Sequence, residues 1–169
     1  LVYCLPAVAL AQAGHKPIIL EDIWQKGTFS SKGIPGFNFQ NDGVHFTRLE
    51  GTAITQYDLR TGERSGTIFD AASVKTDAPA WKGAFDGYSF SLDESKILLT
   101  TNSTPIFRWS TEADFFIFDQ KTKSLTQLYE DNVEYIDKTR RLKKQRYATF
   151  SPDGSKVGFV LKNDLYFKD

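Results

Sequence analysis

Few side chains in this sequence combine the type and the spacing that hydrolytic chemistry requires. A hydrolase serine normally stands in a Gly-x-Ser-x-Gly turn between a strand and a helix. The nearest match, Gly87-Tyr88-Ser89-Phe90-Ser91, lacks the final glycine and lies in a strand-like stretch. The two histidines, His15 and His45, fall in the leader region and in an expected strand. We therefore assign no catalytic residue and build no Ser-His-Asp triad from this chain.

The composition also disfavours metal and nucleic-acid chemistry. One cysteine and two histidines do not make a cysteine-based zinc site or a multi-histidine centre, so we expect no metal and no cofactor. Lys and Arg total 21 and Asp and Glu total 21, and this balance argues against a nucleic-acid partner. The one basic run, residues 140–146, follows an acidic stretch at residues 130–137, which favours a solvated connecting loop.

The elements that would hold any site are short strands joined by tight turns. Phe90–Ile97 aligns with Phe150–Val157, which begins 60 residues later, and both contain a Ser-x-Asp-x-Ser-Lys turn. Tyr57–Gly62 aligns in the same way with Phe118–Lys123, and a longer loop is expected between Thr101 and Phe115. Repeats of about 50 residues with four strands each are typical of β-propeller blades, which are four-stranded antiparallel sheets. The sequence predicts an all-β chain with about two and a half blades, and the repeated turn favours this over a β-sandwich.

The N-terminal residues have a different character. Residues 1–13 are short, apolar and end in Ala11-Gln12-Ala13, the pattern that signal peptidase cleaves after. We interpret them as the remnant of a secretory signal, the alternatives being a buried apolar strand or an artefact of reading frame. Residues 14–35 are an expected extension with a short helix near Leu20–Lys26, and residues 36–169 hold the blades. Because the sequence contains no methionine, we expect it to be a piece of a longer protein. The signal-like segment indicates that this protein is secreted, or lies in the periplasm or cell envelope.

Three landmarks together resemble the dipeptidyl peptidase IV-type serine peptidases of the prolyl oligopeptidase superfamily. Leu20–Trp24 followed by Gly36–Phe39 is similar to the start of that family's first blade. Thr104–Asp119 is similar to its second blade, and Tyr147–Gly154 with Asn163–Tyr166 to its third. These landmarks follow in the family's order, and the resemblance covers about Pro17 to Asp169.

The resemblance implies an eight-bladed N-terminal propeller that caps a C-terminal α/β-hydrolase domain carrying the Ser-Asp-His triad. Such enzymes release X-Pro and X-Ala dipeptides from peptide N-termini, with a glutamate pair and a second-blade arginine holding the substrate. Only the arginine carries over, to Arg108 in Phe107-Arg108-Trp109-Ser110. The alternative for Arg108 is a structural guanidinium stacked on Phe107 or Trp109. The chain contains no Glu-Glu pair, and the glutamates are expected beyond Asp169.

The resulting functional hypothesis is the substrate-gating and substrate-binding propeller part of a secreted dipeptidyl peptidase IV-like exopeptidase. Its expected partners are a peptide substrate and the hydrolase domain of the same parent chain, and the resemblance allows a homodimer of the full-length enzyme. The chain alone is predicted to be inactive because it lacks the nucleophile. Two alternatives stay open: a non-catalytic β-propeller protein-binding module of the cell envelope, and a related oligopeptidase or acylaminoacyl peptidase without the glutamate pair.

Overall fold

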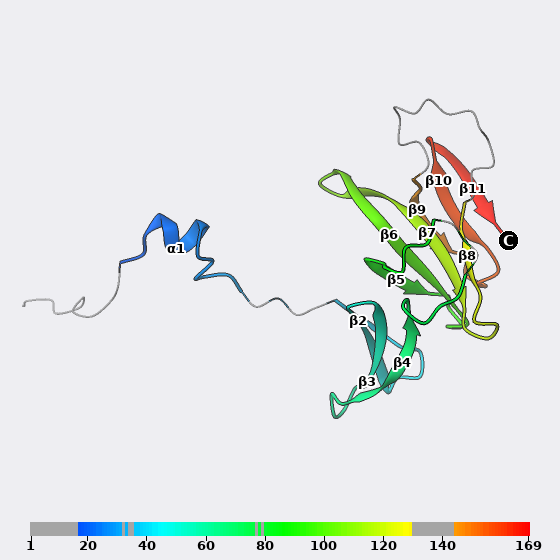
Figure 1. Cartoon of the computed structure of the whole chain (residues 1–169), viewed down its shortest axis with the longest axis horizontal. Helices are drawn as coiled ribbons and strands as arrows, with labels where there is room; N and C mark the ends of the chain where they lie inside the picture. Colours follow the sequence, from blue (N-terminus) through cyan, green and yellow to red (C-terminus); the bar gives the residue numbers. More distant parts are fainter. Residues whose placement is uncertain (1–16, 32, 34–35, 77, 79, 130–143) are drawn as a thin grey trace, which may run out of the picture. The chain divides into compact units, whose positions relative to one another are not determined.

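The computed structural model describes residues 17–31, 33, 36–76, 78, 80–129 and 144–169 (Figure 1). The expected signal remnant, residues 1–13, and residues 140–143 of the basic run lie outside this set. The chain divides into two compact units, Leu1–Ile34 and Pro35–Asp169.

The first unit contains one short helix, α1, at Leu20–Trp24. Asp22 in its first turn pairs with Lys26, whose Nζ lies 2.8 Å from Asp22 Oδ1. Gly27 follows with a φ of +57°, a left-handed conformation that glycine adopts without steric cost and that commonly ends helices. Among the described residues, no helix is long and apolar enough to cross a bilayer.

The second unit consists of three antiparallel sheets that follow one another along the chain. The first sheet has the order β1-β2-β3-β4 and the second β5-β6-β7-β8, while the third has the order β11-β10-β9. The strands of the first sheet are β1 Phe37–Phe39, β2 His45–Glu50, β3 Ala53–Asp58 and β4 Arg64–Asp70. Those of the second are β5 Gly87–Phe90, β6 Lys96–Phe107, β7 Ser110–Asp119 and β8 Leu125–Gln127, and those of the third are β9 Arg146–Phe150, β10 Val157–Leu161 and β11 Asp164–Lys168.

Aspartates close the tight turns between these strands in a repeated way. Asp58 Oδ1 accepts the backbone N–H groups of Arg60 and Thr61 at 2.9 and 2.7 Å. Asp119, in the equivalent turn of the second sheet, accepts those of Lys121 and Thr122 at 2.9 and 2.7 Å. A short carboxylate can thus satisfy backbone donors that the strand ladder leaves unpaired, which is why aspartate recurs at these turns.

The β5–β6 and β9–β10 turns are built by the repeated Ser-x-Asp-x-Ser pattern. Ser91 Oγ donates to Asp93 Oδ1 at 2.6 Å and accepts the backbone N–H of Lys96 at 3.0 Å. Ser151 makes the same 2.6 Å bond to Asp153 in the third sheet. The sequence repeat therefore corresponds to a repeated hydrogen-bonded turn.

The second sheet is buried on both of its faces. On one face, Ile97, Leu99, Phe116 and Phe118 join Ile54 and Phe69 of the first sheet in one apolar cluster. On the other, Leu98 and Phe115 join residues of the third sheet, which are Val157, Phe159 and Leu161. Successive strand residues point to opposite faces, so the continuous apolar run from Ile97 to Leu99 is explained by burial on both sides. A two-layer sandwich would not produce this arrangement.

These findings confirm the predicted all-β class and the two and a half antiparallel blades. They also correct one expectation, because no long loop separates Thr101 from Phe115. Instead β6 continues to Phe107 and β7 begins at Ser110, with ladder irregularities between Thr101 and Thr104 and between Pro105 and Phe107. Pro105 lacks an N–H group and is typical of such irregular positions, so the local pattern resembles a loop where the strands continue.

Candidate functional site

Arg108 stands at the tip of the β6–β7 hairpin, which extends past the first residue of β5, Gly87 (Figure 1). The last ladder pair joins Phe107 to Ser110, so Arg108 and Trp109 form a two-residue turn. The predicted position of Arg108, on a loop of the second blade, is therefore observed as a hairpin turn at one end of the second sheet.

The side chains of this tip are open to solvent. Phe107 is 78% exposed and Trp109 is 89% exposed, and Arg108 is also exposed. Cation–π contacts in the described part of the chain are made by Arg48, Lys123 and Lys156, and none there involves Arg108. In the described structure, then, no cation–π contact joins Arg108 to Phe107 or Trp109. Its guanidinium can therefore present its donors to an external carbonyl or carboxylate.

The base of the hairpin is held on one side by residues of the second sheet and of the segment before it. Asp86 accepts the backbone N–H of Ser103 at 2.9 Å and its hydroxyl at 2.8 Å. Asn102, whose φ is +53°, donates its side-chain amide to Asp114 Oδ2 at 3.0 Å. These bonds lie at the first ladder irregularity, where the regular strand pairing is interrupted.

On the other side, two residues that immediately precede the third sheet hold the hairpin. Ala113 and Gln145 exchange two backbone hydrogen bonds of 2.9 and 2.8 Å as an isolated bridge. The Lys144 ammonium donates to Thr104 Oγ1 at 2.5 Å, and also to the Asn102 carbonyl. The sequence reasoning missed these contacts because they join residues about thirty or forty positions apart and have no local pattern.

The other sequence candidates do not form a catalytic arrangement. His45 Nδ1 lies 2.6 Å from Asp42 Oδ2, but Asp42 also accepts the backbone N–H groups of Val44 and His45, so the pair closes the β1–β2 turn. The hydrogen bond from His45 holds the pKa of Asp42 below its usual value. Ser89 lies within β5, away from any strand-to-helix turn, and His15 lies outside the described residues. The part of the chain that the structure describes contains no cluster of three or more potential metal ligands.

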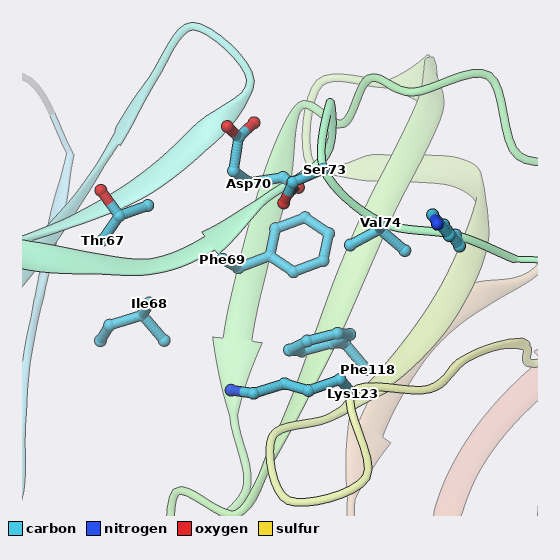
Figure 2. A pocket seen from close by; sticks show the side chains of 9 residues that line it. Thr67, Ile68, Phe69, Asp70, Ser73, Val74, Phe118 and Lys123 are labelled. Atoms are coloured by element: carbon cyan, nitrogen blue, oxygen red, sulfur yellow. Dashed lines mark hydrogen bonds between the residues drawn. The ribbon is translucent and has the colours of Figure 1, made fainter.

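A cavity of about 540 Å³ lies where the first and second sheets meet (Figure 2). Its walls combine Phe69 and Phe118, whose rings are 4.7 Å apart at their centroids, with the stem of Lys123. Both phenylalanines are nearly fully buried, so the hollow is bounded by core side chains. Lys123 and the other polar groups do not converge on one point within it, so the cavity does not constitute a second candidate site (Figure 2).

Comparison with known proteins shows which family this chain resembles. Residues 91–169, which include the whole β6–β7 hairpin and the third sheet, match the family model described as "Dipeptidyl peptidase IV (DPP IV) N-terminal region". This chain is related to the N-terminal region of dipeptidyl peptidase IV. Dipeptidyl peptidase 4 of Trichophyton rubrum is 30% identical over 155 residues, and that of Trichophyton equinum is 29% identical over the same length.

A solved structure extends the likeness to the fold. The crystal structure of Porphyromonas gingivalis dipeptidyl peptidase 4 superimposes with a TM-score of 0.71 and 28% sequence identity over 92% of this chain. The predicted partial β-propeller is thereby confirmed, as an arc of blades that does not close. The chain spans 20% of that structure's chain and 18% of the length of each Trichophyton relative, so it corresponds to one part of such a protein.

Proposed function

We propose that this chain is the substrate-binding and substrate-gating propeller part of a secreted dipeptidyl peptidase IV-like serine exopeptidase. The observation that carries the proposal is similarity along nearly the whole chain, at 90–92% coverage, to dipeptidyl peptidases from fungi and a bacterium. The catalytic triad and the acyl-enzyme chemistry would belong to a hydrolase domain of the same parent chain. Secretion is proposed from the Ala11-Gln12-Ala13 pattern.

Within this function, Arg108 is the proposed substrate-binding residue. Its guanidinium presents a rigid fork of donors that suits a peptide carbonyl oxygen. The exposed two-residue turn leaves those donors unoccupied within the described part of the chain, and the hairpin bonds fix the turn at its base. A hydrogen bond from a charged donor contributes about 1.5–3 kcal/mol in favourable cases. Solvent exposure places Arg108 at the lower end of that range.

The proposed preference is for peptides with a free N-terminus and Pro or Ala in the second position. The peptide's amino group would be held by glutamates of the parent chain, and the carbonyl that follows would be held by Arg108. Blades around the path to the active site would admit slender, extended chains and exclude folded proteins. Gating is thus a property of the whole ring, to which this chain contributes its first blades.

The test is turnover of Gly-Pro-p-nitroanilide by the full-length enzyme that carries this chain, compared with the 169-residue chain alone. The full-length enzyme should release p-nitroaniline, and the chain alone should not. A matched substrate with a blocked amino terminus, acetyl-Gly-Pro-p-nitroanilide, should be a poor substrate for the full-length enzyme. Equal turnover of both would indicate an oligopeptidase instead. A full-length protein without peptidase activity that retains protein ligands would identify the cell-envelope binding module.

A further inference from the structure

We propose that Tyr147, from the third sheet, positions the hairpin that carries Arg108. This inference rests on the proposed function for its catalytic consequence, although the contact on which it is based is structural. Tyr147 Oη lies 2.9 Å from Ser110 Oγ, a hydrogen-bonding distance, and Ser110 is two residues beyond Arg108. Among the described residues, this is the side-chain hydrogen bond that lies closest in sequence to the tip of the hairpin.

The hairpin needs such a contact because its own ladder is irregular. Pairing between β6 and β7 shifts between Thr101 and Thr104 and again between Pro105 and Phe107. A bulge leaves strand residues unpaired and bends the strand, so the regular part of the sheet does not by itself fix the direction of the tip. Contacts from outside the second sheet must supply the missing constraint.

The backbone at Tyr147 is arranged to reach the hairpin. Thr149 pairs with Gly158 and Arg146 with Val160, so two residues of β9, Tyr147 and Ala148, stand opposite the single Phe159. This is a β-bulge, and Tyr147 has a φ of +55° within it. A bulky residue rarely adopts this left-handed conformation, which is sterically unfavourable and persists only where its surroundings hold it.

The outcome of that bulge is a redirected side chain. Tyr147 is 62% exposed and contributes little to the apolar core of the third sheet, so burial does not account for its placement. Its hydroxyl instead reaches across to the neighbouring sheet. Bulges often aim a side chain at a functional site, and here the target is the strand that continues from Arg108.

Other contacts show that residues just before the third sheet also hold the hairpin, at positions farther from its tip. Gln145 joins Ala113 through two backbone bonds, and Lys144 reaches Thr104 on the opposite strand. Of these three residues, Tyr147 contacts the hairpin nearest to its tip. Removing its hydroxyl should loosen the tip while the base stays fixed by Lys144 and Gln145, which makes Tyr147 a positioning residue for Arg108.

The first measurement is hydrogen exchange of the backbone amides in residues 106–112 of the full-length enzyme. In Tyr147→Phe we expect exchange there to accelerate about fivefold, the factor that corresponds to one neutral hydrogen bond. Ser110→Ala should have the same effect, and the double variant should add little to either. Tyr57→Phe is the matched control, because Tyr57 also loses a hydrogen-bonded hydroxyl, at 2.6 Å from Glu50 Oε1 in the first sheet. Unchanged exchange in Tyr147→Phe would overturn the proposal.

The second measurement links the contact to Arg108 in the full-length enzyme. Tyr147→Phe should raise KM for Gly-Pro-p-nitroanilide about fivefold, with kcat nearly unchanged. In an Arg108→Ala background the same substitution should add no further increase, because Tyr147 acts through Arg108. Additive effects on KM would overturn the positioning role. If exchange accelerates in Tyr147→Phe but Arg108→Ala leaves KM unchanged, the contact positions the hairpin as inferred and the proposed role of Arg108 fails instead.

Discussion

Gly154 of the third sheet lies directly against Ser91 of the second, so the equivalent turns of the two sheets touch. A Cβ atom placed on Gly154 would stand 3.3 Å from Ser91 Cβ and 3.6 Å from Asp93 Oδ1. The Lys96 ammonium reinforces the contact with a 3.2 Å hydrogen bond to the Gly154 carbonyl. Neighbouring blades are therefore joined through their turns as well as through their apolar faces.

The junction between the first and second sheets uses the same position. Glu94 occupies the place in the second sheet that Gly154 occupies in the third, and both residues have a positive φ, +57° and +69°. Glu94 Oε1 accepts the backbone N–H of Asn41 in the first sheet at 2.7 Å. In both junctions, then, the residue after the turn aspartate faces the preceding sheet.

Substitution of Gly154 by alanine should destabilise the chain by about 1–3 kcal/mol. One part of the cost is the positive φ, and the other is crowding against Ser91. Gly43→Ala is the matched control, because Gly43 has a φ of +71° but open space around its Cβ position, so its cost should be about 1 kcal/mol. The urea midpoints of the two variants measure the difference. Equal midpoints would show that Ser91 can shift to accommodate the added Cβ atom without a loss of stability.

Replacement of Lys123 by glycine should stabilise the chain by about 0.5–1 kcal/mol. Lys123 has a φ of +58° in the β7–β8 turn, where the equivalent residue of the β3–β4 turn is Gly62 with a φ of +72°. Glycine removes the steric cost of that conformation, and this gain should exceed both its loss of backbone entropy and the loss of the Lys123 contact with the Phe118 ring, 5.9 Å from Nζ to the ring centroid. The reverse substitution, Gly62→Lys, should destabilise the chain by a similar amount. Chemical denaturation tests both, and a lower midpoint for Lys123→Gly would contradict the prediction.

The turn aspartates should make stability fall in acid. Hydrogen bonds from the Ser91 hydroxyl and from Ser95 lower the pKa of Asp93 from 3.8 to about 2. The equivalent bonds from Ser151 and Ser155 lower the pKa of Asp153 to about 2. Because the folded state favours the carboxylate form, the stabilisation is present above about pH 4 and is lost as the pH falls towards 2.

Urea midpoints measured between pH 5 and pH 2 test this dependence. The double variant Asp93→Asn with Asp153→Asn should be less stable near pH 5 and should lose less stability on acidification. Some dependence should remain, because hydrogen bonds from turn residues also lower the pKa values of Asp42, Asp58 and Asp119. Parallel curves for the wild-type chain and the double variant would exclude the two turns as a source of acid sensitivity.

Arg108→Ala in the full-length enzyme should raise KM for Gly-Pro-p-nitroanilide about tenfold, with a smaller change in kcat. This factor corresponds to about 1.4 kcal/mol, a modest value for a charge-assisted bond because the tip is exposed. Arg108→Lys should recover only part of the loss, since an ammonium lacks the planar fork of donors. Lys162→Ala, at an exposed turn of the third sheet, is the control. Unchanged kinetics for Arg108→Ala would remove Arg108 from substrate binding.

Sequence reasoning predicted the strands and turns well because their signals are local. The repeated Ser-x-Asp-x-Ser turns, and the aspartate turns in Tyr57–Gly62 and Phe118–Lys123, are fixed by hydrogen bonds among residues close in sequence. The extension of β6 to Phe107 was missed, because Pro105 and polar neighbours are typical of loops. Contacts with Asp86 and Lys144 stabilise that extension, and neither residue is near it in sequence.

The candidate site was predicted only at Arg108, and through resemblance alone. Tyr147 looked like an ordinary strand residue, and its bulge and positive φ have no sequence signal comparable to glycine or asparagine. The Tyr147–Ser110 contact joins residues 37 positions apart. Such long-range polar contacts depend on how two sheets stack, which a reading of local patterns does not supply.

The burial of the second sheet on both faces has a consequence for synthesis on the ribosome. Ile97 and Leu99 can pack as soon as the first sheet has formed. Leu98 and Phe115 can be buried only when the third sheet is present. Until Phe159 and Leu161 have emerged, one apolar face of the nascent second sheet stays exposed and can associate with other nascent chains. The second sheet is therefore covered on both faces only after the third has been translated, so a translational pause between Leu128 and Arg146 would prolong the exposure of its apolar face.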